Sequence, residues 1–125
     1  MCIEASEINE ELDRILASVE FQEFDPGCRL LQYVVGEAVA GRQQHLDISA
    51  VAHVVFDRDN SYDEKSDPVA RIQTNRTRRA LERYYSGGGQ NNQFRIFFPK
   101  DGYVPMFLQC LVDELAIVDR SFDEL

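Results

Sequence analysis

The polar segment "SGGGQNNQ", residues 86–93, divides the chain into two parts that differ in the spacing of their apolar residues. Before this segment, apolar residues recur at the spacing of helices that pack on one face. After it, "FRIFFPKDGYVPMF" alternates around a turn at 100–102, which predicts a β-hairpin with a short turn at 94–107. The spacing therefore predicts a mainly α fold with a small β-hairpin, of the α+β class, in a single domain over residues 1–125.

Two helices are predicted in the N-terminal part. The first covers 6–19, where Ser6 is a typical N-cap and acids fill the first turn. Pro26-Gly27 is typical of a turn that breaks the chain before the next helix. That second helix covers 28–40 and is followed by Gly41, where a left-handed residue is expected after a helix.

Two more helices are predicted before the polar segment. The apolar residues of "ISAVAHVVF" fall on one face of a short helix at 48–56, which Asp47 or Ser49 could cap. Its valines leave a strand as the alternative. Ser66-Asp67-Pro68 is typical of a helix start, with a capping oxygen before a proline in the first helical position, and predicts a helix over 68–85.

The last of these helices gathers positive charge, although the chain as a whole has a formal net charge of −9. Its only acid is Glu82. A helical wheel places Val69, Ala70, Gln73, Thr77, Ala80, Leu81 and Tyr84 toward the core. The wheel places Arg71, Asn75, Arg78, Arg79 and Glu82 on the opposite side, and Arg76 and Arg83 at the boundary, where their stems can cover apolar surface.

This charge pattern has two interpretations. The arginines could form a solvated face that balances the acidic N-terminal helices, but exposed ion pairs contribute at most about 1 kcal/mol each. The alternative is nucleic-acid binding, because binding depends on the local field at the docking face rather than on the net charge. The choice of arginine over lysine favours the second interpretation, since the planar guanidinium suits phosphates and guanine edges.

Other kinds of chemistry find little support in the sequence. The three cysteines are scattered and odd in number, which argues for free thiols in a reducing cytoplasm. His45 and His53 have no matching cysteine pair, so we expect no metal site, and no cofactor motif or catalytic motif occurs. The first residues lack the basic region and apolar run of a signal peptide, so we expect none, and no apolar run is long enough to span a membrane. We therefore expect a cytoplasmic protein that is not an enzyme.

Two stretches, "DPVARIQTNRTRRALERYY" and "FRIFFPKDGYVPMF", resemble the winged-helix domain at the N-termini of many bacterial sensory and TPR-containing proteins. More distantly, they are similar to the output domain of OmpR-type response regulators. The resemblance covers about residues 10–107 and includes "LDRILAS", "LLQYVVGEAVAGR" and "VVFDR". It implies a winged helix-turn-helix core over 6–107, followed by a C-terminal helix or tail at 108–125.

The resemblance also implies roles for the predicted elements. The helix at 48–56 would support the helix at 68–85, which would enter the major groove of double-stranded DNA, with the hairpin as wing. Tyr103, after Gly102, would pack into the core. The base- and phosphate-facing residues would be Arg71, Asn75, Arg78, Arg79 and Glu82. The side chains that neutralise phosphates would be Arg76, Arg83, Arg95 and Lys100.

Some residues depart from the pattern of the family. Asn75 and Thr77 stand where an arginine and a leucine are common, and Asp101 replaces a small residue in the wing. These changes lower the positive charge of the DNA-facing side. They favour a second hypothesis, in which the fold is kept as a protein-protein interaction or adaptor module.

An apolar stripe follows the hairpin at the spacing of a short amphipathic helix. Its residues are Leu111, Leu115, Val118, Phe122 and Leu125. The stripe could pack back onto the domain or form a homodimer seam, and the first helix is a second candidate seam. A dimer is expected for sequence-specific binding, because one helix contacts few base pairs.

Overall fold

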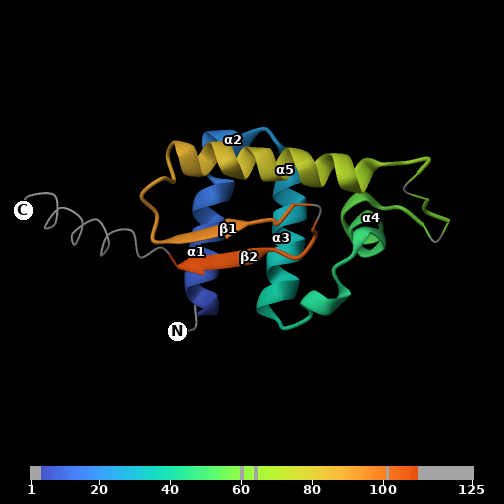
Figure 1. The fold of residues 1–125 in the computed structure, drawn as a ribbon, viewed down its shortest axis with the longest axis horizontal. Coiled ribbons are helices and arrows are strands. Elements are labelled where there is room, and N and C mark those ends of the chain that lie inside the picture. The colour runs from blue at the N-terminus through green and yellow to red at the C-terminus, as the bar shows by residue number, and fades with distance from the viewer. Residues whose placement is uncertain (1–3, 60, 64, 101, 110–125) are drawn as a thin grey trace, which may run out of the picture.

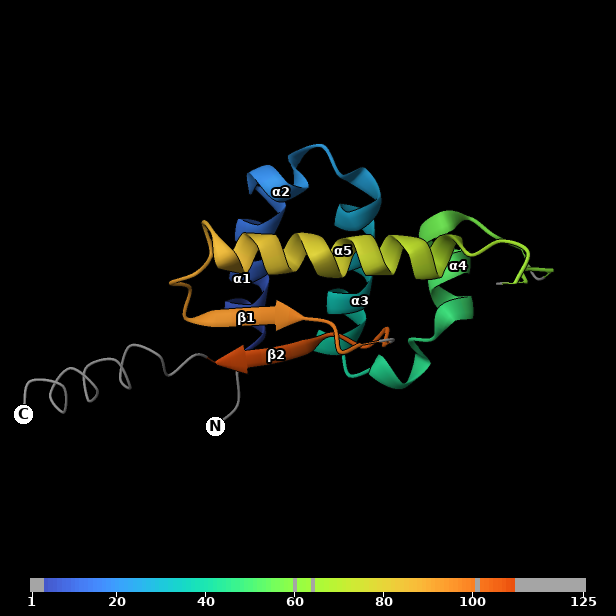
Figure 2. The same cartoon turned by 45° about the horizontal axis from the view of Figure 1, so that its top comes forward.

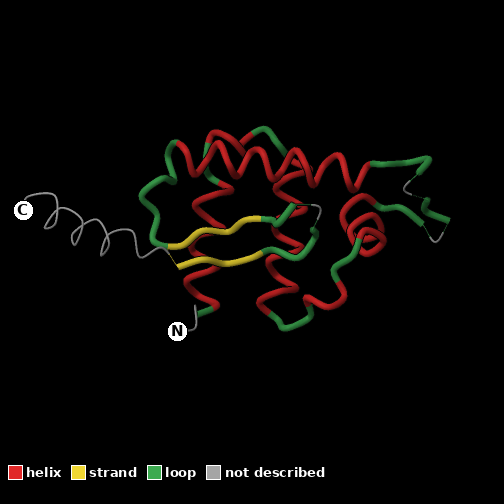
Figure 3. Tube along the Cα trace, in the orientation of Figure 1, coloured by secondary structure: helices red, strands yellow, loops and turns green. Residues whose placement is uncertain are grey.

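The computed structural model describes residues 4–59, 61–63, 65–100 and 102–109, most of which are helical (Figure 1; Figure 3). The helices are α1 (Ala5–Leu16), α2 (Val19–Gln22), α3 (Asp25–Val39), the 3-10 helix η1 (Gln43–His45), α4 (Ile48–Phe56) and α5 (Val69–Ser86). The strands β1 (Phe94–Phe97) and β2 (Met106–Gln109) form a two-stranded antiparallel sheet. The prediction of a mainly helical α+β fold is confirmed. The stripe at 111–125 lies outside the described residues.

Helix α5 and the hairpin lie across α1 and α3, which run side by side (Figure 1). Helix α4 lies beside the N-terminal end of α5 and also contacts α3. In Figure 2, α2 lies on one side of α5 and β1 on the other, and both contact it. Helix α5 therefore has two flanks, which we name the α2 flank and the hairpin flank.

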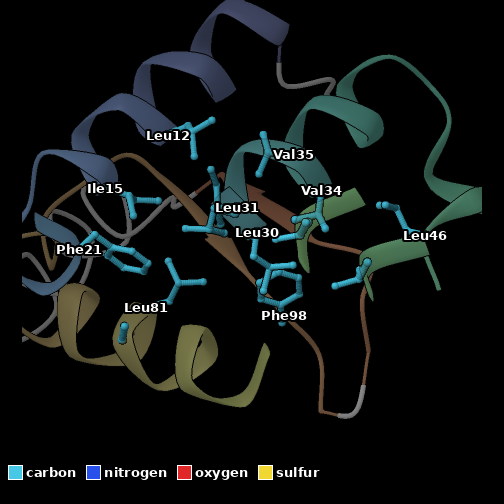
Figure 4. Close-up of a cluster of buried hydrophobic side chains, with 14 of the residues drawn as sticks. Leu12, Ile15, Phe21, Leu30, Leu31, Val34, Val35, Leu46, Leu81 and Phe98 are labelled. Atoms are coloured by element: carbon cyan, nitrogen blue, oxygen red, sulfur yellow. The ribbon is translucent and has the colours of Figure 1, made fainter. Parts of the chain in front are cut away.

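The apolar faces of the helices and the inner face of the hairpin meet in one core (Figure 4). Leu31 of α3 and Leu81 of α5 are almost fully buried in it, together with Phe21. Each buried side chain of this size contributes roughly 1.5–3 kcal/mol to folding. This packing sets the position of α5 relative to α3 and β1.

The first helix differs at both ends from the prediction. Its N-cap is Glu4, which forms a capping box with Glu7, and not Ser6. The helix ends at Leu16, because the backbone of Ser18 is extended and its hydroxyl donates to the carbonyl oxygen of Ile15 at 2.5 Å. The predicted helix at 6–19 is thus divided between α1 and α2.

The turn predicted at Pro26-Gly27 is wrong, because both residues lie in the first turn of α3. Proline is tolerated there, since the first N–H groups of a helix have no partner within the helix. Gly27 is buried against Phe24, whose ring a Cβ atom at this position would overlap. The segment therefore starts a helix three residues earlier than predicted.

Helix α4 is capped by Asp47, whose Oδ1 accepts a hydrogen bond from the backbone N–H of Ala50 at 2.8 Å. The helix over 48–56 is confirmed, and the alternative of a strand is wrong. A capped N-terminus together with a buried face of Val51 and Val55 outweighs the β propensity of the valines.

The start of α5 differs from the prediction. No side chain caps this helix, and Pro68 precedes the first helical residue instead of occupying that position. Asp67 accepts a hydrogen bond from Nε of Arg58 at 2.6 Å, so its carboxylate closes the loop between α4 and α5. The carboxylate therefore joins the two ends of this loop rather than capping the helix.

The hairpin has a longer connection than the predicted short turn. Phe97 pairs with Met106, and residues 98–105, which we name the hairpin loop, join the strands. Pro99 and Pro105 lie in this loop, since proline cannot donate a ladder hydrogen bond. Tyr103 packs against the core, as expected.

A buried polar cluster ties α1 to the end of α5 and to the hairpin. The fully buried carboxylate of Glu11 accepts hydrogen bonds from the Tyr85 hydroxyl at 2.7 Å and from Nδ2 of Asn92 at 3.0 Å. Arg14 pairs with the same carboxylate at 3.0 Å. The Tyr85 oxygen in turn accepts from the backbone N–H of Ile96 at 2.9 Å. The cluster thus fixes β1 against α5.

This cluster predicts a loss of stability at alkaline pH. Burial, and then the hydrogen bond to the Glu11 carboxylate, raise the pKa of the Tyr85 hydroxyl above its usual range. Tyrosine in the unfolded chain titrates near pH 10, so the unfolded state loses its proton first. The free energy of unfolding should therefore decrease as the pH rises above about 10.

Urea unfolding between about pH 8 and about pH 11 measures this effect. The decrease should be shallower in Tyr85→Phe than in the wild type. Burial also raises the pKa values of Tyr33 and Tyr84, so Tyr85→Phe should keep part of the decrease. Parallel pH profiles for the two proteins would contradict the assignment.

Candidate nucleic-acid interface

Helix α5 buries one face along its whole length. Its buried residues are Ala70, Thr74, Thr77, Ala80, Leu81, Tyr84 and Tyr85. The core side predicted from the helical wheel is confirmed for Ala70, Thr77, Ala80, Leu81 and Tyr84, whereas Val69 and Gln73 are half-buried. The wheel did not place Thr74 and Tyr85 toward the core. Tyr85 is buried by its contacts with α1 and β1.

The hairpin flank brings part of the predicted site together with the hairpin loop. Arg71, Asn75 and Arg78 line a cavity of about 260 Å³ whose other wall contains Gly102 and Tyr103. Ile48 and Thr74 complete the lining of what we name the loop cavity. Oδ1 of Asn75 accepts hydrogen bonds from both terminal nitrogens of Arg78, at 2.7 and 2.5 Å. This contact orients the guanidinium.

A second cavity of about 380 Å³ continues along this flank toward the C-terminal end of α5. Arg78, Glu82 and Arg95 line it together with apolar residues of α5 and the hairpin. The Arg95 guanidinium lies 5.2 Å from the Tyr85 ring centroid and donates to the carbonyl oxygen of Gln90 at 3.1 Å. Lys100 is exposed on the hairpin loop. Arg78 of α5 and Arg95 of β1 thus face the same cavity.

The α2 flank carries the remaining arginines next to acids. Arg76, Arg79 and Arg83 line a cavity with Glu20 and Glu23 of the α2 region. Within the described part of the chain, neither Arg79 nor Arg83 forms an ion pair. The nearby carboxylates nevertheless lower the positive potential of this flank.

Arg76 lies on the α2 flank in the way predicted for a boundary residue. Its guanidinium carbon is 4.9 Å from the centroid of the Phe24 ring, and Nη1 donates to Oε1 of Gln73 at 3.3 Å. The stem of Arg76 was expected to cover apolar surface with its head in solvent, whereas the guanidinium itself lies over the Phe24 ring. Arg79 was expected to lie beside Arg71 and Arg78, but it lines the α2 flank instead.

Sequence reasoning missed the residues that hold α5 and the hairpin together. Glu11 lies in an acidic stretch but on the same helical face as Ile8 and Ile15, and this position was the available indication of burial. Its partners Tyr85 and Asn92 are 74 and 81 positions away. No local pattern could have joined these three residues.

The residues considered for other chemistry have structural contacts. Sγ of Cys28 donates to the carbonyl oxygen of Phe21 at 3.1 Å, and burial, with the nearby Asp25 carboxylate, raises the pKa of this thiol. Nδ1 of His53 lies 3.0 Å from the carbonyl oxygen of Arg58. In the described ranges, no three residues of the types His, Cys, Asp and Glu form a cluster suited to a metal ion.

None of the described helices combines the length and the apolar character needed to cross a membrane. No protein-family model matches the chain, and neither a curated protein nor a solved structure matches it.

Proposed function

We propose that this protein is a sequence-specific DNA-binding transcription regulator of the bacterial cytoplasm. In this proposal the fold acts as a winged helix-turn-helix, with α4 as supporting helix, α5 as recognition helix and the hairpin as wing. One observation carries the proposal. Arg71, Asn75 and Arg78 of α5 line the same cavity as Gly102 and Tyr103 of the hairpin loop, so the basic flank of the helix and the loop face the same side.

The chemistry of this flank suits DNA. An α-helix fits the major groove, where an arginine can contact O6 and N7 of guanine and an asparagine can contact adenine. Arg71, Asn75 and Arg78 are the residues proposed to face the bases and the phosphates next to them. Arg95 and Lys100 of the hairpin would neutralise phosphates beside the groove, whereas Arg76, Arg79 and Arg83 on the α2 flank would contribute mainly through long-range attraction.

Useful sequence specificity is expected to need two copies on half-sites about one helical turn apart. In α1 the apolar residues Ile8, Leu12 and Ile15 are turned into the core. A dimer contact through α1 would therefore use its polar face. The stripe at 111–125 remains the apolar candidate for a homodimer seam.

Binding of duplex DNA as a function of salt tests the proposal. The logarithm of the affinity should decrease linearly with the logarithm of the salt concentration. The slope should be about −3 to −4 per subunit if Arg71, Arg78, Arg95 and Lys100 each contact a phosphate. Genome fragments captured by the purified protein would supply the probes. If no fragment binds at micromolar protein and low salt, the proposed function is wrong.

The exposed apolar side chains favour the alternative, a protein-protein interaction or adaptor module. Val54 on α4 and Ile72 on α5 are 54% and 48% exposed, and the net charge of the chain is −9. Apolar surface on α4 and α5, the proposed supporting and recognition helices, would suit a protein partner. The same salt titration separates the two functions, because an adaptor would show no affinity for DNA.

A further inference from the structure

The hydroxyl of Thr74 is a buried polar group without a partner. The residue is 4% exposed, and Oγ1 makes no hydrogen bond. Thr77, one turn further along α5, shows the usual arrangement, in which the hydroxyl donates to the carbonyl oxygen four residues earlier, that of Gln73, at 2.7 Å. A buried hydroxyl that forgoes this bond costs free energy unless something outside the chain satisfies it.

Thr74 lines the loop cavity together with two cationic side chains. Arg71 and Arg78 belong to the lining, and none of the lining residues in the described part of the chain is an acid. Asn75 holds the guanidinium of Arg78 beside the cavity. The carboxylate of Asp47, next to Ile48, is engaged with the backbone N–H of Ala50. The lining is therefore rich in donors and carries positive charge.

The size of the loop cavity suits a small ligand. Its volume of about 260 Å³ exceeds the roughly 30 Å³ that one water molecule occupies in the liquid. Guanidinium groups match the oxygen atoms of a phosphate with two parallel hydrogen bonds. A buried hydroxyl adds a donor that solvent does not compete for.

We propose that the loop cavity binds a phosphate-type oxyanion, through the Arg71 and Arg78 guanidiniums and the Thr74 hydroxyl. The oxyanion is either a free phosphate group or a phosphate of the DNA backbone. A free oxyanion would compete with DNA for Arg71 and Arg78. This consequence rests on the proposed function, whereas the binding site itself does not.

The variant Thr74→Val tests the site, because valine keeps the shape of threonine and removes the hydroxyl. Inorganic phosphate should raise the thermal midpoint of the wild type relative to chloride at equal ionic strength. The expected rise is roughly 5 °C at about tenfold its Kd. At least half of this rise should be lost in Thr74→Val. Thr77→Val is the matched control, because the Thr77 hydroxyl is bonded within the helix, and it should keep the full rise.

A second arm measures duplex DNA binding by the same variants and distinguishes the two sources. If phosphate raises the thermal midpoint and this rise is lost only in Thr74→Val, the ligand is a free oxyanion. If phosphate has no effect, a several-fold weaker DNA affinity of Thr74→Val, with Thr77→Val unchanged, identifies a backbone phosphate. A rise that persists in Thr74→Val, or no effect in either arm, overturns the proposal.

Two features keep the test decisive. Thr74→Ser, which keeps the hydroxyl, should retain the wild-type response, and Thr74→Ala replaces the valine variant if valine prevents folding. If the wild type binds no DNA at all, the phosphate arm alone decides. Failure of the proposed function therefore leaves the oxyanion site testable, and failure of the site leaves DNA binding intact.

Discussion

Replacing Arg71 and Arg78 together by alanine should reduce the affinity for duplex DNA by at least about 100-fold near 0.1 M salt. Both side chains line the loop cavity, on the flank that α5 shares with the hairpin loop. Each arginine that contacts a guanine contributes about 1–3 kcal/mol of discrimination. Fluorescence anisotropy with a captured DNA fragment measures the loss.

The control removes the same charge from the other flank. In Arg76→Ala combined with Arg83→Ala, the affinity should decrease by about tenfold or less, because these side chains lie near Glu20 and Glu23. The DNA affinity should also become less dependent on salt in the variant that lacks Arg71 and Arg78 than in the variant that lacks Arg76 and Arg83. Equal losses in the two pairs would show that net charge, and not the face shared with the hairpin, governs binding.

Replacing Glu11 by alanine should lower the free energy of unfolding by about 2–4 kcal/mol. The substitution leaves the buried hydroxyl of Tyr85 and the amide of Asn92 without their acceptor. It also removes the ion pair with Arg14. Urea denaturation gives the difference as a shift of the midpoint at constant m.

Glu10→Ala is the matched control, because Glu10 is the exposed neighbour of Glu11 on the same helix. Its substitution removes the same charge and should change the stability by less than about 0.5 kcal/mol. A similar loss in both variants would mean that charge, and not the buried cluster, stabilises the fold. Since the cluster holds β1 against α5, Glu11→Ala should also weaken any function that needs the hairpin loop in place.

The local features of the sequence predicted the order of elements well. The apolar spacing of 48–56 and Asp47 before it led to α4, and the spacing of 69–85 led to the buried face of α5. The predicted ends of helices were less accurate where a residue type is compatible with two local structures. Pro26 suits both a turn and the first turn of a helix, and only the packing of Gly27 on Phe24 decides between them.

The bounds of the hairpin strands were also only partly predictable from local features. The alternation of "FRIFFPKDGYVPMF" led to two strands, but their exact pairing depends on which residues contact α1 and α5. With Pro99 and Pro105 outside the ladder, the connection became the longer hairpin loop that lies beside Arg71 and Arg78. The loop cavity, and the unpartnered Thr74 hydroxyl in its lining, could therefore not be inferred from the order of residues.

By itself, the sequence determined that an acidic chain gathers five arginines on one amphipathic helix, because helical periodicity is a local property. Only the tertiary structure decided which of them share a side with the hairpin. Helix α5 packs between α2 and β1, so Arg71 and Arg78 lie toward the hairpin and Arg76, Arg79 and Arg83 lie toward the acids of the α2 flank. The physical reason is that burial of the apolar face fixes the rotation of the helix, and this rotation depends on contacts with residues far away in the chain.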